Sequence, residues 1–189
     1  MHSIWKTSIR FTLVTAILLG LGYPLFVTGL AALIFPHQAA GSLIKLNDGT
    51  VIGSELLAQS FTADKYFHPR PSAAGNGYDA TASGGSNLAQ SSKTLIDRIQ
   101  GSIDKLSKEN PGKPVPIDLV TTSASGLDPD ITPDAAYFQA PRVAKTRGIS
   151  EDRIRQLIEQ HITSRQLGVL GEPRVNVLEL NLALDELPK

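Results

Sequence analysis

The fold of this chain is decided near its N-terminus by the stretch FTLVTAILLGLGYPLFVTGLAALIF, which runs from Phe11 to Phe35. Not one charged residue interrupts it. A bilayer core about 30 Å thick is crossed by about 20 consecutive apolar residues in a helix. The stretch therefore predicts a single transmembrane helix over residues 11–35, with enough length for some tilt.

Four residues of the predicted span are expected to shape its path and its packing. Pro24 has no backbone N–H to donate and is expected to kink the helix. Small residues allow a second helix to approach closely in a membrane. We therefore predict membrane-packing positions at Gly20, Gly22, Pro24 and Gly29.

The charges on either side of the span predict its orientation. Lys6 and Arg10 precede it without any acidic residue, and the first charge beyond it is Lys45. The positive-inside rule then places residues 1–10 in the cytoplasm and residues 36–189 on the extracytoplasmic side. A cleaved signal peptide is the alternative, but its apolar region is usually only roughly 7–15 residues long. A retained anchor is expected.

The composition excludes several classes of protein. The chain has 18 basic and 18 acidic residues among 189, and this balance argues against a nucleic-acid binder. A hydrophobic share of 41% predicts a folded domain and not a disordered chain. The lack of cysteine excludes disulfide scaffolds, cysteine-ligated metal centres and thiol nucleophiles. The four histidines do not have the spacing of a zinc motif, and no metal site is predicted.

A single mixed α/β domain is predicted to follow the span. Two β-prone runs on either side of Asn47-Asp48-Gly49 indicate a hairpin over residues 43–53. Residues 66–87 are so rich in proline and glycine that they predict a long, functional loop. Apolar residues at helical spacing predict a helix over 88–108, and alternation predicts a strand over 115–121.

Two further helices and a final strand complete the predicted domain. Thr132, which is followed by a proline, is typical of a helix start. Pro141 is expected to interrupt that helix before it ends at Gly148. Ser150 is expected to cap the next helix. Alternating apolar residues predict a strand over 175–184, with a register change near Leu178 and Glu179 that is either a bulge or the end of the strand.

The usual catalytic motifs are absent from the sequence. It contains no phosphate-binding loop, no dinucleotide-binding glycine motif and no nucleophile elbow. Ser102 and Lys105 match a Ser-x-x-Lys pattern, but they lie inside a predicted helix, where chance explains the match. A membrane-tethered extracytoplasmic serine hydrolase remains the alternative function, with His68 or His161 as its base.

Two polar tracts remain as candidate functional surfaces. One is the loop 66–87, in which Ser86 or Asn87 is expected to cap the following helix. The other is the tract 127–134, whose carboxylates at positions 128, 130 and 134 are of a kind that holds hard cations. The same aspartates also suit turns and a helix start without any ion, so cation binding stays open.

Long segments of the chain resemble the C subunit of the Kdp potassium-transporting P-type ATPases. The resemblance covers nearly the whole chain and is carried by YFHPRPS at 66–72, GYDATASGGSNL at 77–88, DLVTTSASGLDPDI at 118–131, APRVA at 140–144 and GVLGEPRVNVLELN at 168–181.

This resemblance implies a non-catalytic subunit of a prokaryotic inner-membrane complex for ATP-driven potassium uptake. The implied partners are a P-type ATPase pump subunit, a channel-like potassium-binding subunit and a small single-span peptide. ATP and Mg²⁺ are expected on the pump subunit, K⁺ is the transported ion, and no cofactor is expected in this chain. The helper role in nucleotide binding that is associated with the family conflicts with an extracytoplasmic domain.

The external domain is accordingly expected to hold the complex together and to shape the extracellular potassium entrance. Rigidity and polarity make the two tracts the predicted contact surfaces. The predicted partner-contact residues are His68, Arg70, Asn76, Tyr78, Asp79, Ser86, Asn87, Asp128 and Asp130. Whether Asp128, Asp130 and Asp134 bind a cation is not decided by the sequence.

Overall fold

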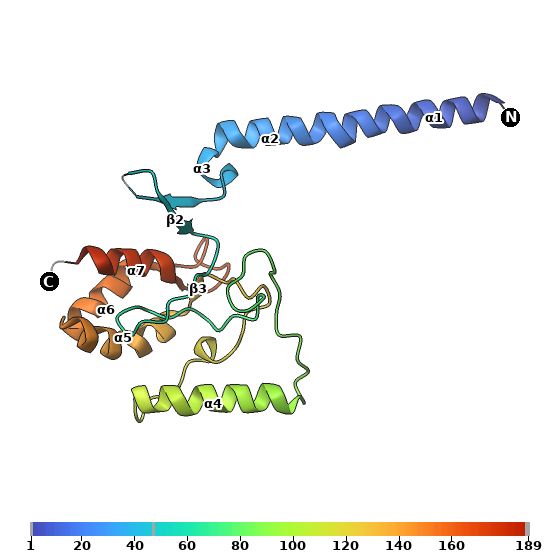
Figure 1. Ribbon diagram of the computed structural model, residues 1–189. Helices are drawn as coiled ribbons and strands as arrows, with labels where there is room; N and C mark the ends of the chain where they lie inside the picture. The colour runs from blue at the N-terminus through green and yellow to red at the C-terminus, as the bar shows by residue number, and fades with distance from the viewer. Residues whose placement is uncertain (1, 47, 188–189) are drawn as a thin grey trace. The chain divides into compact units, whose positions relative to one another are not determined.

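The computed structural model describes residues 2–46 and 48–187 (Figure 1). Contacts between backbone segments divide the chain into two units, with the boundary between Ser54 and Glu55. The predicted mixed α/β class, with one apolar helix near the N-terminus, is confirmed.

The first unit begins with a long apolar helix. It consists of α1 (His2–Ile17), a π-helical turn η1 (Leu18–Gly22) and α2 (Tyr23–Ile34), which run on as one rod in Figure 1. Within the described residues, the 32 residues from Ser3 to Ile34 form the one helix long and apolar enough to cross a membrane, and its most apolar 18-residue stretch has a mean hydropathy of 2.1. Its most apolar part is not buried against the rest of the chain.

Pro24 disturbs the helix by widening one turn. The N–H of Tyr23 donates to the carbonyl of Leu18, five residues back, so the turn before the proline is π-helical. Such turns are a recognised way to absorb a disruption inside an α-helix. Gly20 lies in the π-helical turn and Gly29 in α2, and a Cβ added to either would meet no atom within 4 Å. These glycines therefore leave open helix surface.

A hairpin follows the apolar helix. After the short helix α3 (Pro36–Ala39), the strands β1 (Leu43–Lys45) and β2 (Val51–Ser54) pair antiparallel, which confirms the predicted hairpin. Of the predicted turn residues, Asn47 lies outside the described residues. The carboxylate of Asp48 accepts the N–H of Thr50 at 2.9 Å, which fixes the turn.

The second unit is built around three helices and a small sheet. The helices are α5 (Pro133–Arg147), α6 (Glu151–Gln160) and α7 (Val177–Glu186). The sheet has the antiparallel order β3-β5-β4, from β3 (Asp130–Ile131), β5 (Arg174–Asn176) and β4 (Ile162–Thr163). The core that they enclose is formed mainly by Phe67, Ile131, Ala135, Ala136, Ala140, Val143, Ile154, Ile158, Val175, Val177, Leu180 and Leu184.

Helix α5 confirms two of the predicted signals and corrects a third. The hydroxyl of Thr132 accepts the N–H of Ala135, and the helix ends at Gly148, whose φ is +69°. Pro141 does not interrupt the helix, although its missing N–H removes one intrahelical hydrogen bond. The core side chains on both sides of it, Ala140 and Val143, are fully buried and keep the helix in place.

The start of helix α4 (Lys93–Glu109) differs from the prediction. Ser92 occupies the N-cap position, so the predicted start at residue 88 and the predicted caps Ser86 and Asn87 are wrong. Asn87 has a φ of +50°, a left-handed conformation in which the backbone turns, and the helix begins six residues later, at Lys93.

The predicted strand over 115–121 is also wrong. Its central residues form the 3₁₀ turn η2 (Ile117–Leu119). Pro114 and Pro116 cannot donate to a ladder of hydrogen bonds, which favours an irregular segment.

The predicted strand over 175–184 is a strand only at its start. β5 ends at Asn176, and the side chain of this residue accepts the N–H groups of Leu178 and Glu179, at 3.1 and 3.2 Å, as the cap of α7. The apolar residues of the segment alternate, but Leu180 and Leu184 are also four positions apart and share one buried face.

Candidate interaction site

The two polar tracts predicted from the sequence meet in the structure. An ion pair joins Arg70 Nη1 to Asp128 Oδ2 at 2.9 Å. The hydroxyl of Ser72 donates to the carbonyl of Gly126, and the N–H of Gly84 donates to the carbonyl of Ser125 at 2.8 Å. Because these contacts lie along the length of the loop, residues 70–85 and 123–128 form one continuous surface, called here the tract junction.

Gly126 lies at the closest backbone approach of the tract junction. Its φ of +68° is in the left-handed region, and an added Cβ would lie 2.6 Å from the carbonyl oxygen of Gly84 and 2.7 Å from the nitrogen of Ala74. Both neighbours are backbone atoms, which cannot rotate away. The junction therefore requires glycine at this position.

Hydrogen bonds inside the loop hold its shape. The hydroxyl oxygen of Ser72 accepts the N–H of Tyr78 at 2.8 Å and that of Ala74 at 3.1 Å. The hydroxyl of Tyr78 donates to the carbonyl of Arg70 at 2.8 Å. Burial raises the pKa of this hydroxyl, so it remains a donor at neutral pH. The loop is thus an ordered structure without helix or strand.

Two side-chain amides fix the loop to the core, and sequence reasoning missed both. Asn181 accepts the N–H of Phe67 at 2.8 Å and donates to its carbonyl at 2.9 Å. Gln139 accepts the N–H of His68 at 2.8 Å and donates to its carbonyl at 3.1 Å. Each amide satisfies both backbone groups of one residue, as a neighbouring strand would do. The available signal was a lone amide among the apolar residues of a helix.

His68 lies in the wall of a cavity of about 270 Å³, together with Tyr78, Ser102 and Lys105. Burial lowers the pKa of its imidazole, and the positive charge of Arg142 adds to this effect. Its Nε2 lies 3.2 Å from the carbonyl oxygen of Ala63. The imidazole is therefore held by the backbone and favours its neutral form.

The same cavity contains Ser102 and Lys105, the Ser-x-x-Lys pair that a hydrolase would use. The hydroxyl of Ser102 donates to the carbonyl of Arg98 within helix α4, at 3.0 Å. In the part of the chain that the structure describes, no hydrogen bond joins Ser102 to His68 or to Lys105. An activated serine needs such a bond to its base, so this arrangement gives the hydrolase alternative no support.

A polar pocket of about 300 Å³ opens at the tract junction, between Arg70, Asp128 and Asp130 on one side and Glu172 and Arg174 on another. Asp130 pairs with Arg174 Nε at 2.9 Å. Burial raises the pKa of Asp130, and the positive charge of Arg174 opposes the rise. Asp128 and Asp130 are thus both engaged in ion pairs.

Metal binding has no geometric basis in the described residues, among which no three His, Cys, Asp or Glu side chains form a group suited to an ion. The carboxylate of Asp118, which also lines the polar pocket, accepts the N–H of Thr132 at 2.7 Å. Asp134 is exposed in the first turn of α5. Asp118, Asp128 and Asp130 therefore have separate structural partners, and Asp134 lies apart from them at the start of α5.

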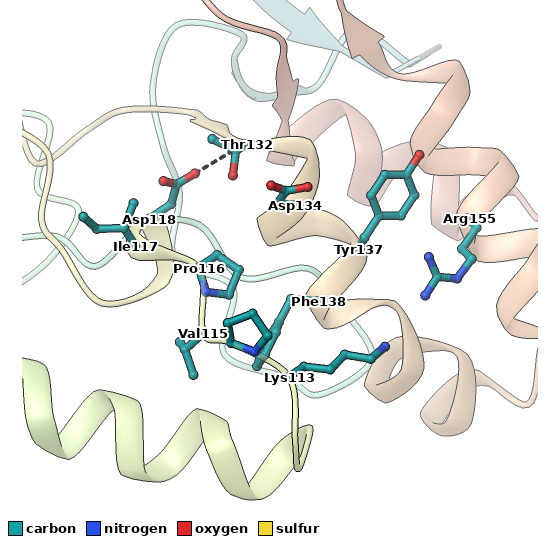
Figure 2. Close-up of a pocket in the computed structure, with 11 residues that line it drawn as sticks. Lys113, Val115, Pro116, Ile117, Asp118, Thr132, Asp134, Tyr137, Phe138 and Arg155 are labelled. Atoms are coloured by element: carbon teal, nitrogen blue, oxygen red, sulfur yellow. Dashed lines mark hydrogen bonds between the residues drawn. The ribbon is translucent and has the colours of Figure 1, made fainter.

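A larger pocket of about 570 Å³ adjoins the polar one and shares Asp118 and Thr132 with it. Figure 2 shows Val115, Pro116 and Phe138 along its apolar wall. Its other lining residues include Lys113, Asp134, Tyr137 and Arg155, and the guanidinium of Arg155 lies 5.4 Å from the centre of the Tyr137 ring. The second unit thus has a continuous hollowed surface of mixed polarity beside the tract junction.

A sequence profile for the family described as "K+-transporting ATPase, c chain", KdpC, matches residues 5–186. The chain belongs to the KdpC family.

Curated KdpC relatives are similar over almost their whole length. The potassium-transporting ATPase KdpC subunit of Rhodopseudomonas palustris (strain BisB18) is 57% identical over 192 residues, which cover 95% of this chain and 96% of the relative. The subunits of that name from Koribacter versatilis and Acidobacterium capsulatum are 56% identical over 179 residues and 57% identical over 183 residues. The match to the Koribacter versatilis subunit covers 95% of this chain and 92% of the relative. The match to the Acidobacterium capsulatum subunit covers 96% of this chain and 97% of the relative.

Among the predicted contact residues of this KdpC chain, three residues of the loop 66–87 reach solvent. Asn76, Asp79 and Asn87 are exposed, whereas Ser86 is half-buried. Hydrogen bonds from Thr81 lower the pKa of the Asp79 carboxyl. These residues therefore form an exposed rim around the buried contacts of the tract junction, and their role as partner contacts stays a prediction.

Proposed function

We propose that this KdpC-family chain is a non-catalytic accessory subunit of an ATP-driven potassium uptake complex. In this proposal it stabilises the assembly of a P-type ATPase pump subunit, a channel-like potassium-binding subunit and a small single-span peptide. Its second unit, on the extracytoplasmic side, shapes the potassium entrance. The observation that carries the proposal is the tract junction, an ordered and ion-paired surface on a chain with an apolar anchor helix.

The order of the loop supports a binding role. A surface whose conformation is fixed before association loses little conformational entropy when it binds. The loop 66–87 lacks helix and strand, but the amides of Gln139 and Asn181 and the ion pair of Arg70 with Asp128 hold it in place. Such a loop is suited to present its exposed rim to another subunit.

The proposed orientation separates this chain from the nucleotide. ATP and Mg²⁺ are assigned to the cytoplasmic part of the pump subunit, and K⁺ to the channel-like subunit. The second unit then meets external potassium and not ATP. Its contribution is to hold and shape the complex, while hydrolysis takes place on the partner.

The orientation is testable because the chain has no cysteine. We expect Ser107→Cys, at an exposed position of α4, to react with a membrane-impermeant maleimide in intact spheroplasts. Ser8→Cys, at an exposed position before the apolar stretch, serves as the matched control and is expected to react in inside-out vesicles only. The reverse pattern of labelling would show that the second unit is cytoplasmic.

The assembly role is tested by co-purification with a tagged pump subunit. Without this chain, we expect the pump and channel-like subunits to separate, and cells to lose uptake at micromolar potassium. In the full complex, Asn76→Trp places a large ring on the exposed rim, where it is expected to clash with the partner subunit. A clash of about 1.4 kcal/mol would lower retention of the chain about tenfold. Ser107→Trp on α4 is the control. An intact, active complex without the chain would refute the proposal.

A further inference from the structure

The segment from Gln166 to Leu170 forms a tight turn that carries large aliphatic side chains into solvent. The N–H of Gln166 donates to the carbonyl of Leu170, and the N–H of Leu170 donates back to Gln166, both at 2.9 Å. Leu167 is 90% exposed, Val169 72% and Leu170 56%. Residues 167–170 are called the aliphatic tip.

The aliphatic tip is held in a conformation that its sequence does not favour. Leu167 has a φ of +53°, in the left-handed region where residues other than glycine are uncommon. Further hydrogen bonds, from Gly168 to Arg165 and from Val169 to Gln166, order the turn. An ion pair between Arg165 and Glu172 joins the two sides of its stem. A leucine at this position is strained and buries almost nothing, and local rules of this kind are most often broken at functional sites.

We propose that the aliphatic tip inserts into an apolar pocket on another protein subunit of the complex and acts as its docking contact. This inference rests on the proposed function, because it requires that the chain is assembled with partner subunits. It assigns a role to residues that neither the tract junction nor its pockets include.

The charges around the tip favour a protein partner over the lipid surface. Arg165 is paired with Glu172, and Arg174 with Asp130, so neither is an unpaired cation for anionic headgroups. Beyond Ser54 the chain has 15 basic and 17 acidic residues, so the second unit is slightly acidic. The tip contains no Trp or Tyr, the residues typical of membrane interfaces.

The size of the tip indicates a partner that is already held nearby. A stable interface on its own buries about 1,600 Å² of surface, and a turn with three apolar side chains cannot supply this area. A second copy of the chain that met only at this turn would therefore not stay bound. A subunit of the same membrane complex needs no such area, because other contacts keep it at a high effective concentration.

The surroundings of the tip match the usual anatomy of an interface. Its stem continues into Glu172 and Arg174, which line the polar pocket of the tract junction together with Arg70 and Asp128. An apolar anchor beside ion-paired polar groups corresponds to the core and rim of protein interfaces. The tip would supply the apolar core, and the tract junction the polar rim.

Leu167→Gly separates docking from folding. Glycine favours a positive φ, so the variant is expected to unfold at the same or a higher temperature than the wild type, while the apolar side chain is lost. In the detergent-solubilised complex, where no bilayer remains, we expect the variant chain to dissociate about tenfold faster from the tagged pump subunit and its partners. The control is Ile96→Ser, which removes an aliphatic side chain that is 56% exposed on helix α4. Serine is used there because glycine would perturb the helix.

A photo-crosslinking residue, p-benzoylphenylalanine, in place of Val169 identifies what the tip contacts in the intact complex. We expect a covalent product with one partner subunit, and none when the same residue replaces Ile96. Crosslinking to lipid alone, or dissociation of Leu167→Gly at the wild-type rate, would overturn the docking role. Loss of the wild-type chain from the complex would instead overturn the proposed function, so the two failures are distinguishable.

Discussion

Replacing Gly126 by alanine is expected to lower the free energy of unfolding by about 3 kcal/mol and to open the tract junction. A side chain at a positive φ costs about 1 kcal/mol, and overpacking against fixed neighbours costs about 1–3 kcal/mol more. The new Cβ would lie 2.6 Å from the carbonyl oxygen of Gly84 and 2.7 Å from the nitrogen of Ala74. Since neither atom can rotate away, the loop and the tract must move apart.

Gly148→Ala is a closely matched control for this prediction. Gly148 has a φ of +69°, against +68° at Gly126, but a Cβ added to it would meet nothing within 4 Å. It is expected to cost only the conformational part, about 1 kcal/mol. Urea denaturation of the full chain in detergent, followed by circular dichroism, measures both variants. Equal losses would show that the close backbone approach at Gly126 has no energetic importance.

The features that the sequence predicted well are those determined over short distances. The uncharged stretch before Phe35 is one helix, and Thr132, Gly148 and Ser150 occupy the predicted ends of α5 and α6. A capping hydroxyl or a left-handed glycine acts through its nearest backbone neighbours, so a few adjacent residues suffice to predict it.

The predictions that failed depended on packing between distant segments. In the segment 177–184, the same leucines satisfy both an alternating and a helical pattern, and the cap at Asn176 decides between them. For the stretch around Ile117, apolar alternation predicted a strand, but Pro114 and Pro116 each remove one donor that a ladder would need. Alternation alone is thus weak where a cap or a proline is close.

The candidate site was predicted in its parts but not in its assembly. Both polar tracts were recognised, yet nothing local to either indicates that Arg70 pairs with Asp128, a residue 58 positions away. The amides of Gln139 and Asn181 were missed because asparagine and glutamine side chains usually face solvent. Here each is almost fully buried and satisfies the backbone of the loop.

The second large effect is expected from Asn181→Leu, a substitution of similar volume in the core. Asn181 is 1% exposed, and it pairs with both the N–H and the carbonyl of Phe67, which is itself fully buried. Leucine leaves these two backbone groups without partners and away from water. Each unsatisfied group costs about 1–3 kcal/mol, so we expect a loss of about 3 kcal/mol in the free energy of unfolding.

The measurement combines urea denaturation with hydrogen exchange. The amide of Phe67 is expected to exchange much faster in Asn181→Leu than in the wild type, because its acceptor is removed. Asn76→Leu, at an exposed position of the same loop, is the control and is expected to change stability by less than about 0.5 kcal/mol. Since His68 follows Phe67 directly, the variant also tests whether the core amides hold the loop. If Asn181→Leu unfolded at the wild-type urea concentration, the order of the loop would have to come from Gln139 and the tract junction.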